Sequence, residues 1–428
     1  MIVNIVTLGC SKNLVDSEHL LYQFRASGYR VMHDRYDTPS DIVIINTCGF
    51  ILDAKEESVD TILSFIEEKR RGNLKRLFVM GCLSERYRKE LKAEMPDVDG
   101  FFGVWEFPRI LESAGSRLDH QLTTGRVVTT PSHYAYLKIS EGCNRTCAFC
   151  AIPGIRGQQR SVSIDELLEE SLILAEGGVK ELILIAQDLT SYGTDLYGGR
   201  VLPRLLKELV RVEGIDWIRL HYAYPAGFPE EVIELMASEE KICNYMDIPI
   251  QHINDGILKA MGRGHTREKL ELLLAKFRWE IPDVALRTTV LTGFPGETVE
   301  AFEELMEFLK EFRFDRLGVF PYSHEENTPA HAGKDDIPER VKSERAEAVM
   351  ELQQDISCQL NRERIGKSYR VLVDRKEKEY FVGRTQYDSP EVDNEVLIPA
   401  DNKLSTGEFY RVKITGANEF DLYGTVER

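Results

Sequence analysis

Hydrophobic and polar positions alternate with two different periods along the first hundred residues. Short apolar runs with a strand-like pattern are separated by longer stretches in which apolar residues recur at helical spacing. The runs are "IVNIVTL" (2–8), "DIVIINT" (41–47) and "RLFVMG" (76–81), and the helical stretches cover about 14–27, 53–70 and 84–93. Strands that alternate with helices predict a parallel sheet with crossover helices.

The same alternation continues on a larger scale from about residue 134 to residue 330. Helical patterns such as "SIDELLEESLILAEGG" and "TVEAFEELMEFLKEF" separate successive apolar runs. These runs are "AYLKIS", "ELILIA", "WIRLHY", "YMDIPI", "ALRTTVLTG" and "RLGVFPYS". Six strand–helix units in series predict a partial or full barrel of the (β/α) type.

The pattern changes again toward the end of the chain. A charged stretch at about 338–364 has no glycine or proline after Pro338, which predicts one long connecting helix. From about residue 367 there follow "SYRVLVD", "YFVGRT", "NEVLIPA", "FYRVKIT" and "DLYGTVE". Five short strands predict a small antiparallel β-barrel. We therefore expect an α/β protein with an N-terminal parallel sheet, a central (β/α) partial barrel and a C-terminal antiparallel barrel.

Composition narrows the class of protein. A chain of 428 residues is long for a single core, so two or three domains are expected. No charged segment followed by an apolar core opens the chain, and no apolar run approaches the roughly 20 residues of a membrane-spanning helix. We expect a cytoplasmic protein. The net charge of −17 disfavours a broad nucleic-acid-binding surface and suits a basic partner, although an acidic surface that is merely solvated is the simpler interpretation.

Three cysteines that are far apart in the sequence occupy equivalent positions in the predicted sheet. Cys10, Cys48 and Cys82 each follow an apolar strand and precede a predicted helix. The carboxyl ends of parallel strands lie on one edge of a sheet, and helix N-terminal amides favour thiolate over thiol. A single cysteine at such a position would be interpreted as a small buried apolar residue, which is also what we expect of Cys243 and Cys358. Three together predict a metal or cluster site.

A second set of three cysteines lies within the stretch "EGCNRTCAFC". Cys143, Cys147 and Cys150 have the spacing C-x3-C-x2-C, with no fourth cysteine or nearby histidine pair to close a zinc site. Three thiolates on a cubane iron–sulfur cluster leave one iron open, as a reactive site requires. This spacing resembles that of the radical S-adenosylmethionine superfamily, in which the methionine moiety of the substrate chelates the open iron.

Two three-cysteine sets in this order resemble the methylthiotransferase family over essentially the whole chain. "GCSKNLVDSE" (9–18) resembles its opening motif, "KISEGCNRTCAFCAIPGIRGQQRS" (138–161) its cluster motif, and "LTGFPGET" (291–298) its late barrel motif. The resemblance implies a methylthiotransferase domain at 1–125 that binds a second cluster, a radical domain at 129–362 and a TRAM domain at 363–428. A cluster carrier without catalytic activity is the alternative from another functional class.

Three stretches are similar to the RimO branch, which modifies an aspartate of a small-subunit ribosomal protein, rather than the branch that modifies a tRNA adenosine. They are Ser11-Lys12-Asn13 after Cys10, "YSHEENTPA" (322–330) and "GRTQYDSPEVDNEVLI" (383–398). The last stretch contains Asp388, Glu391 and Asp393 but no lysine or arginine after Arg384. These acids are predicted to bind a basic ribosomal protein, unless they form a polar loop without a partner. The tRNA enzyme remains the alternative.

The resemblance also implies the cofactors and the chemistry. Two [4Fe-4S] clusters would be held by the six cysteines, the first generating a deoxyadenosyl radical from S-adenosylmethionine and the second carrying the sulfur of the methylthio group. An electron donor such as flavodoxin or ferredoxin would supply electrons. No catalytic residue beyond the cluster ligands is predicted. The expected S-adenosylmethionine contacts, for which packing is the alternative role, are Phe149, Gln187, Arg287, Thr289 and Gly293.

Overall fold

The structure is a computed structural model that describes residues 1–119, 122, 124–401 and 403–427. The chain forms two compact units. The first unit comprises Met1–Thr130, Tyr136–Arg145 and Cys150–Ile173, and the second comprises Pro131–Ala135, Thr146–Phe149 and Leu174–Arg428. The loop with the C-x3-C-x2-C spacing therefore contributes residues to both units. The predicted domain limits at 125, 129 and 363 stay a prediction.

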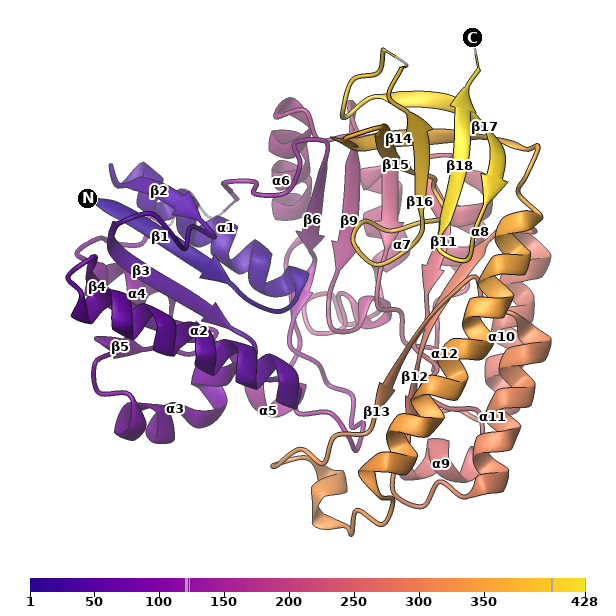
Figure 1. The fold of residues 1–428 in the computed structure, drawn as a ribbon, viewed down its shortest axis with the longest axis horizontal. Coiled ribbons are helices and arrows are strands. Elements are labelled where there is room, and N and C mark those ends of the chain that lie inside the picture. Colours follow the sequence, from indigo (N-terminus) through magenta and orange to yellow (C-terminus); the bar gives the residue numbers. More distant parts are fainter. Residues whose placement is uncertain (120–121, 123, 402, 428) are drawn as a thin grey trace. The chain divides into compact units, whose positions relative to one another are not determined.

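The first unit is built on a parallel five-stranded sheet with the order β2-β1-β3-β4-β5 (Figure 1). Its strands are β1 (Ile2–Thr7), β2 (Arg30–His33), β3 (Ser40–Thr47), β4 (Leu74–Gly81) and β5 (Gly100–Phe101). Its helices are α1 (Ser11–Ala26), α2 (Leu52–Arg70), α3 (Cys82–Glu94) and α4 (Phe107–Ala114). The sequence pattern missed β2 and β5, which are short edge strands with little apolar periodicity.

Alternating side chains of this sheet enter two separate cores. Ile42 and Ile44 face one core together with residues of α1 and α4, whereas Val43 and Ile45 face the other with residues of α2 and α3. Burial of both faces explains why the strands read as continuous apolar runs. The sheet edge is thus the part of this layer where polar side chains can gather.

Three short elements lie between β6 (Tyr134–Lys138) and α6 (Ile164–Glu176) in the sequence. They are β7 (Ser140–Glu141), α5 (Ile152–Arg156) and β8 (Arg160–Ser161), and β7 pairs with β8 in antiparallel fashion. All three belong to the first unit. The loop between β7 and α5 carries Cys143, Cys147 and Cys150.

The second unit contains most of a sheet with the order β13-β12-β11-β10-β9-β6. Of β6, only the first two residues belong to this unit. The pairs from β9 to β13 are parallel. The strands are β6 (Tyr134–Lys138), β9 (Glu181–Ile185), β10 (Trp217–Leu220), β11 (Ile242–Asp247), β12 (Ala285–Thr292) and β13 (Arg316–Pro321). The sheet is open, so the predicted barrel is a partial one.

Helices connect and follow these strands, and the long α12 lies beside β13 and β12 in Figure 1. They are α6 (Ile164–Glu176), α7 (Leu202–Leu209), α8 (Glu231–Ser238), α9 (Asp255–Ala260), α10 (Arg267–Glu280), α11 (Val299–Phe312) and α12 (Glu339–Arg362). Short 3₁₀ turns occur at Leu189–Ser191 and Pro329–Ala332. In the part of the chain that the structure describes, no helix has the length and apolar character needed to cross a membrane.

The tail folds as a closed barrel with the order β14-β15-β16-β18-β17. Its strands are β14 (Ser368–Glu377), β15 (Tyr380–Arg384), β16 (Glu395–Pro399), β17 (Phe409–Ala417) and β18 (Asp421–Val426). Alternate side chains such as Val371, Val373 and Ile398 fill its core. Closure leaves no unpaired sheet edge. The predicted α/β fold class with a small C-terminal β-barrel is confirmed, but the barrel is not antiparallel throughout, because β16 and β18 pair in parallel fashion.

Candidate functional site

The three cysteines of the first unit lie at the carboxyl ends of adjacent strands, as predicted. Cys10 is the N-cap of α1 after β1, Cys48 directly follows β3, and Cys82 is the first residue of α3 after β4. β3 pairs with both β1 and β4. Cys10 is exposed, whereas Cys48 and Cys82 are buried. The sheet order therefore brings together thiols that the sequence separates.

Glycines beside the cysteines allow this close approach. A Cβ atom on Gly9 would lie 2.6 Å from Cys48 Cβ and 2.9 Å from Cys48 Sγ, and Gly9 has a φ of +89°. A Cβ atom on Gly49 would lie 2.6 Å from both the backbone nitrogen and the Cα of Leu83, next to Cys82. Larger residues at either position would push the cysteine-bearing turns apart. Gly9 and Gly49 are therefore part of the site.

Asn13 joins the strand ends that carry two of these cysteines. Its amide donates hydrogen bonds to the carbonyl oxygens of Leu8 (2.8 Å) and Thr47 (3.2 Å). The Ser58 hydroxyl accepts the Cys48 N–H at 3.1 Å and donates to the Cys48 carbonyl at 2.9 Å. The buried Asn13 and Ser58 thus satisfy the backbone groups that the strand ends leave unpaired.

Burial controls the protonation of the two inner thiols. It raises the pKa of the Cys82 thiol to about 12, and the neighbouring Arg156 guanidinium opposes this shift. Burial likewise raises the pKa of Cys48. Among the described residues, no three His, Cys, Asp or Glu side chains are placed to hold a single metal ion. The donors at this edge are sulfur atoms, which suit an iron–sulfur cluster.

A buried group of charged side chains adjoins the three thiols. Arg156 hydrogen-bonds the Cys82 sulfur and the Asn13 side-chain oxygen, and its Nη1 lies 2.8 Å from Glu141 Oε2 and 3.4 Å from Asp16 Oδ2. Lys138 pairs with the same two carboxylates. Although burial acts in the opposite direction, Lys138 and Arg156 lower the pKa of Glu141. The two cations and two carboxylates compensate one another out of water.

Sequence reasoning did not assign this charged group. Lys138, Glu141 and Arg156 lie within the quoted motif "KISEGCNRTCAFCAIPGIRGQQRS", and Asp16 lies within "GCSKNLVDSE". Their presence in the two motifs was the available signal. Their mutual contacts depend on tertiary folding, because they are up to 140 positions apart in the chain.

The C-x3-C-x2-C loop is held by backbone hydrogen bonds in each unit. In the first unit, the Cys143 N–H donates to the Gly157 carbonyl at 3.1 Å. In the second unit, the Ala148 N–H donates to the Met261 carbonyl and its own carbonyl accepts from Ala330, both at 2.8 Å. Because the loop is divided between the two units, the positions of the three thiols relative to one another stay a prediction from their spacing in the sequence.

Cys147 is buried beside a cation in the second unit. Its Sγ lies 3.5 Å from Nη1 of Arg263 and 3.9 Å from the Tyr224 hydroxyl oxygen. The Arg263 guanidinium stacks on the Tyr224 ring at 4.3 Å. The Arg263 guanidinium thus donates toward the sulfur, whereas the Tyr224 hydroxyl accepts from the Cys147 thiol and donates to the Arg263 carbonyl. Arg263 and Tyr224 are further residues of the site that the sequence reasoning missed.

The predicted S-adenosylmethionine contacts differ in where the structure places them. Phe149 packs against an apolar cluster that includes Met261 and Tyr322, and Gln187 follows the carboxyl end of β9. Thr289 lies within β12. Gly293 follows β12, where its N–H donates to Glu297. For these four residues, cofactor binding stays a prediction.

Arg287 is engaged by protein carboxylates. Its Nη1 lies 3.2 Å from Asp247 Oδ1, and its Nε lies 3.4 Å from Asp393 Oδ1 in the tail. Although burial acts in the opposite direction, these carboxylates raise the pKa of Arg287. The structure thus gives Arg287 a role in joining β12 to the tail and offers no support for its predicted contact with S-adenosylmethionine.

The expected acidic surface of the tail is wrong for two of its three acids. Asp388 is fully buried and pairs with Arg316, and the Asp393 side chain is 1% exposed and accepts a hydrogen bond from Tyr245 at 2.8 Å. Only Glu391 is exposed. Asp388 and Asp393 are thus paired with arginines of the central sheet. Substrate binding by Asp388 and Asp393 would require this junction to open.

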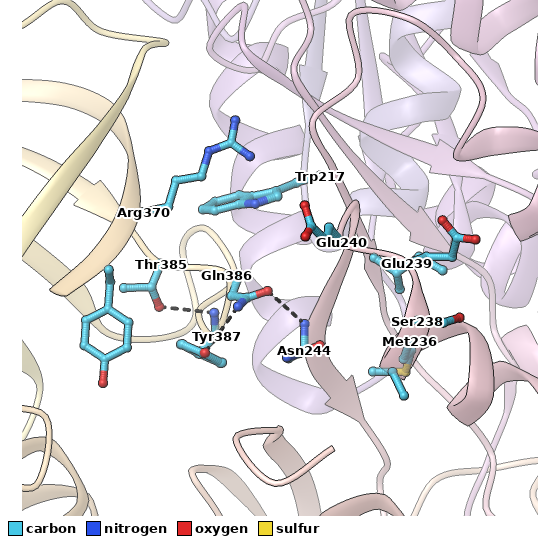
Figure 2. Close-up of a pocket in the computed structure, with 13 residues that line it drawn as sticks. Trp217, Met236, Ser238, Glu239, Glu240, Asn244, Arg370, Thr385, Gln386 and Tyr387 are labelled. Atoms are coloured by element: carbon cyan, nitrogen blue, oxygen red, sulfur yellow. Dashed lines mark hydrogen bonds between the residues drawn. The ribbon is translucent and has the colours of Figure 1, made fainter. Parts of the chain in front are cut away.

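A cavity of about 330 Å³ lies between the tail barrel and the central sheet (Figure 2). It includes Trp217 and Ile242, the first residues of β10 and β11. Gln386 accepts the Asn244 N–H at 3.3 Å across it, as Figure 2 shows. None of the predicted site residues lines this cavity. It lies at the amino-terminal ends of the strands, whereas barrel active sites lie at the carboxyl ends.

Comparisons with known proteins place the chain in a family. The Radical SAM superfamily matches residues 137–309, Uncharacterized protein family UPF0004 matches 2–103, and a TRAM domain matches 365–426. Ribosomal protein uS12 methylthiotransferase RimO of Christiangramia forsetii is 56% identical over 423 residues, which are 99% of this chain and 93% of that protein. The protein of the same name from Phocaeicola vulgatus is 52% identical over 99% of each chain. The chain belongs to the RimO family of methylthiotransferases.

Solved structures support the fold at low sequence identity. The radical S-adenosylmethionine methyltransferase TsrM from Kitasatospora setae, solved with cobalamin and a [4Fe-4S] cluster, has a TM-score of 0.55 and 15% identity. The match covers 77% of this chain and 76% of TsrM. The cobalamin-dependent radical enzyme OxsB has a TM-score of 0.51 and 15% identity over 81% of this chain and 56% of its own.

These findings confirm several predictions from the sequence. The family, the fold class and the assignment as a radical S-adenosylmethionine methylthiotransferase are confirmed. The relatives support the ribosomal-protein branch over the tRNA branch. Membership of the radical superfamily implies one [4Fe-4S] cluster and S-adenosylmethionine.

Proposed function

We propose that this protein transfers a methylthio group to the β-carbon of an aspartate in ribosomal protein uS12. The observation that carries the proposal is the pair of three-cysteine sets on a chain that matches RimO proteins over nearly its full length. Each set leaves one iron of a [4Fe-4S] cluster without a protein ligand. Two vacant irons suit a reaction that needs both a radical and a sulfur source.

The loop with Cys143, Cys147 and Cys150 is proposed to serve radical generation. Cys143, Cys147 and Cys150 would hold the cluster there, and when bound it would supply the electron for cleavage of S-adenosylmethionine to methionine and a deoxyadenosyl radical, the species that would take a hydrogen atom from the aspartate. The protein holds the ligands there. The Gly157 carbonyl accepts the Cys143 N–H, and the Arg263 guanidinium donates to the Cys147 sulfur.

The strand-end cysteines are proposed to hold a second [4Fe-4S] cluster, whose chemistry is to supply the methylthio sulfur. The six thiols divide between an eight-residue loop and a sheet edge, so each set is fixed by its own structure. A flavodoxin or a ferredoxin is the proposed electron donor, and the cytoplasm the proposed compartment. A tRNA adenosine is the alternative substrate.

The deciding experiment uses full-length protein reconstituted with iron and sulfide without oxygen. It is incubated with reductant, S-adenosylmethionine and uS12, and uS12 peptides are analysed by mass spectrometry. We expect a methylthio-sized gain on one aspartate together with deoxyadenosine. Deoxyadenosine without any change in uS12 would refute the proposed substrate, and the same incubation with tRNA followed by nucleoside analysis would test the alternative.

Three variants separate the proposed roles of the cysteines. Cys147→Ala should abolish deoxyadenosine release, whereas Cys48→Ala should keep it and stop sulfur transfer. Cys243→Ala is the matched control, because Cys243 is a fully buried cysteine outside both sets. Sulfur transfer by the Cys48→Ala protein would contradict the role given to the second cluster.

A further inference from the structure

Arg156 lies at the end of a short segment that connects the two cysteine sets. It is the last residue of α5, which begins two positions after Cys150. Ala151 and Ile155 at this helix pack in one apolar cluster with Cys82. The next residue, Gly157, accepts the backbone N–H of Cys143 at 3.1 Å. Residues 150–157 therefore contact Cys82 of one set and Cys143 of the other.

The Arg156 guanidinium is fixed in place by buried partners. The side chain is 2% exposed, and its polar contacts are the Cys82 sulfur, the Asn13 side-chain oxygen, and the carboxylates of Glu141 and Asp16. An arginine stays charged in proteins, and its planar fork gives these contacts a defined direction. A positive charge is therefore held against a cysteine sulfur by contacts on several sides.

The partners of Arg156 form their own balanced group. Lys138 pairs with Asp16 and, at 2.7 Å, with Glu141, so the two carboxylates are shared by two cations. Removing the guanidinium would leave two carboxylates against one lysine beside the cysteine edge. The local charge would become more negative by one unit, and one hydrogen bond to a cysteine sulfur would be lost.

We propose that Arg156 is a positioning residue that raises the reduction potential of the cluster held by Cys10, Cys48 and Cys82. The inference rests on the proposed function, which places a cluster there. Reduction adds negative charge to a cluster, and a nearby cation with a hydrogen bond to a ligand sulfur favours the reduced state. Arg156 thus connects the electronic state of the sulfur-supplying site to segment 150–157, which carries Cys150 and contacts Cys143 through the Gly157 carbonyl.

The test isolates this cluster in the full-length chain. Cys143, Cys147 and Cys150 are replaced by Ala to give a parent protein with only the strand-end set. The parent and its Arg156→Gln and Arg156→Lys derivatives are reconstituted without oxygen. Iron and sulfide content and an electron paramagnetic resonance redox titration are then measured.

Arg126 supplies the matched control. Its side chain is 1% exposed and lies 3.2 Å from Glu18 and 3.1 Å from Glu170, with no cysteine among the partners that the structure gives it. Arg126→Gln removes an equally buried guanidinium from the same unit. A general loosening of the unit would therefore affect this variant as well.

We expect Arg156→Gln to lower the midpoint potential, so that the ratio of reduced to oxidised cluster at the parent's midpoint falls about tenfold, as for loss of one hydrogen bond to a charged group. Arg156→Lys should keep most of the potential, and Arg126→Gln should leave it unchanged. An unchanged potential in Arg156→Gln, or an equal shift in Arg126→Gln, would overturn the inference alone. If Arg156→Gln does not fold, Arg156→Lys decides: a potential measurably below the parent's, with that of Arg126→Gln unchanged, supports the inference, and a potential equal to the parent's, or a shift no larger than in Arg126→Gln, overturns it. A parent without a cluster would overturn both this inference and the second cluster of the proposed function.

Discussion

Replacing Asp388 by Asn should destabilise the junction between the tail barrel and the central sheet. Asp388 is fully buried, and its Oδ1 accepts hydrogen bonds from Nε (3.1 Å) and Nη2 of Arg316. Its Oδ2 accepts the Thr385 hydroxyl at 2.6 Å. The Arg316 side chain is 5% exposed, so it has no access to bulk water when its partner is removed.

The magnitude follows from the buried charge that the substitution leaves behind. Removing one member of a buried ion pair costs about 3–5 kcal/mol, because the other charge stays desolvated. Asn keeps the shape and one oxygen acceptor, and Arg316 keeps a 2.6 Å hydrogen bond to the Asp315 carbonyl. We therefore expect a loss of about 3 kcal/mol in the free energy of unfolding, at the lower end of that range.

The effect should depend on pH in a defined direction. Although burial acts in the opposite direction, Arg316 and Arg364 hold the pKa of Asp388 below 3.8. A depressed carboxyl pKa contributes stability that is fully present above the unfolded value and is lost as the pH falls through the folded value. The difference between the two proteins should therefore be constant from pH 5 to 8, about the range of maximal stability, and shrink only below about 4.

Trp217 supplies a probe at the junction. It is 3% exposed, and its ring lies 4.8 Å from that of Phe409 in the tail barrel. Urea unfolding is followed by its fluorescence in a background with Trp105→Phe and Trp279→Phe. A multidomain chain need not unfold in one step, so the transition that this probe reports is the one compared.

Glu391→Gln is the control in the same loop. Glu391 is exposed, and its contact with the Tyr134 hydroxyl is 3.3 Å. Its replacement should change the free energy of unfolding by less than about 0.5 kcal/mol, as for ordinary surface substitutions. A loss below about 1 kcal/mol in Asp388→Asn, or an equal loss in the control, would refute the reasoning from the buried pair.

Three further predictions concern the strand ends and the junction. Gly293→Ala should destabilise the protein by about 1–3 kcal/mol more than Gly296→Ala. Both glycines have a positive φ, but only at Gly293 would an added Cβ collide with Lys342. Equal urea midpoints for the two variants would contradict this prediction. Cys48→Ala should reduce the iron bound after reconstitution by about half, as for loss of one of two clusters, and unchanged iron would count against the second cluster. Glu181→Gln should lower the free energy of unfolding by about 3–5 kcal/mol at neutral pH, because Glu181 is buried between Arg219 (2.7 Å) and Arg384 (2.8 Å). Although burial acts in the opposite direction, these arginines lower the pKa of Glu181, so the loss should shrink only as the pH falls below 4.5. Calorimetric unfolding at several pH values measures the size of the loss and its pH dependence.

The strand ends that carry the cysteines were predictable from the sequence, because each strand is marked by a local apolar run. The apolar runs before Cys10, Cys48 and Cys82 fixed three parallel strands, and sheet geometry then required their carboxyl ends to share an edge. The C-x3-C-x2-C loop was predictable for the same reason, because its ligands are neighbours in the chain. Short-range pattern and one rule of sheet topology were sufficient to place the strand-end cysteines on one edge, whereas the joint geometry of the loop cysteines stays a prediction.

Burial of charge was where sequence reasoning went wrong. Asp388 and Asp393 read as an acidic surface because the composition of a segment does not reveal which arginines it will meet. Their partners Arg316 and Arg287 come from strands of the central sheet that are 72 and 106 positions away. The sequence alone does not distinguish an aspartate on the surface from one in a buried ion pair.

The sequence by itself determined the order of the main strands and helices, apart from the short edge strands β2 and β5, together with the two cysteine sets and the family. These depend on periodicity, spacing and motifs, which are properties of neighbouring positions. Only the tertiary structure decided that Arg156 lies against Cys82, that Asn13 joins two strand ends, and that the tail acids close a junction. Buried charges are stable only beside opposite charges or hydrogen-bond partners, and the fold alone determines which distant residues supply them.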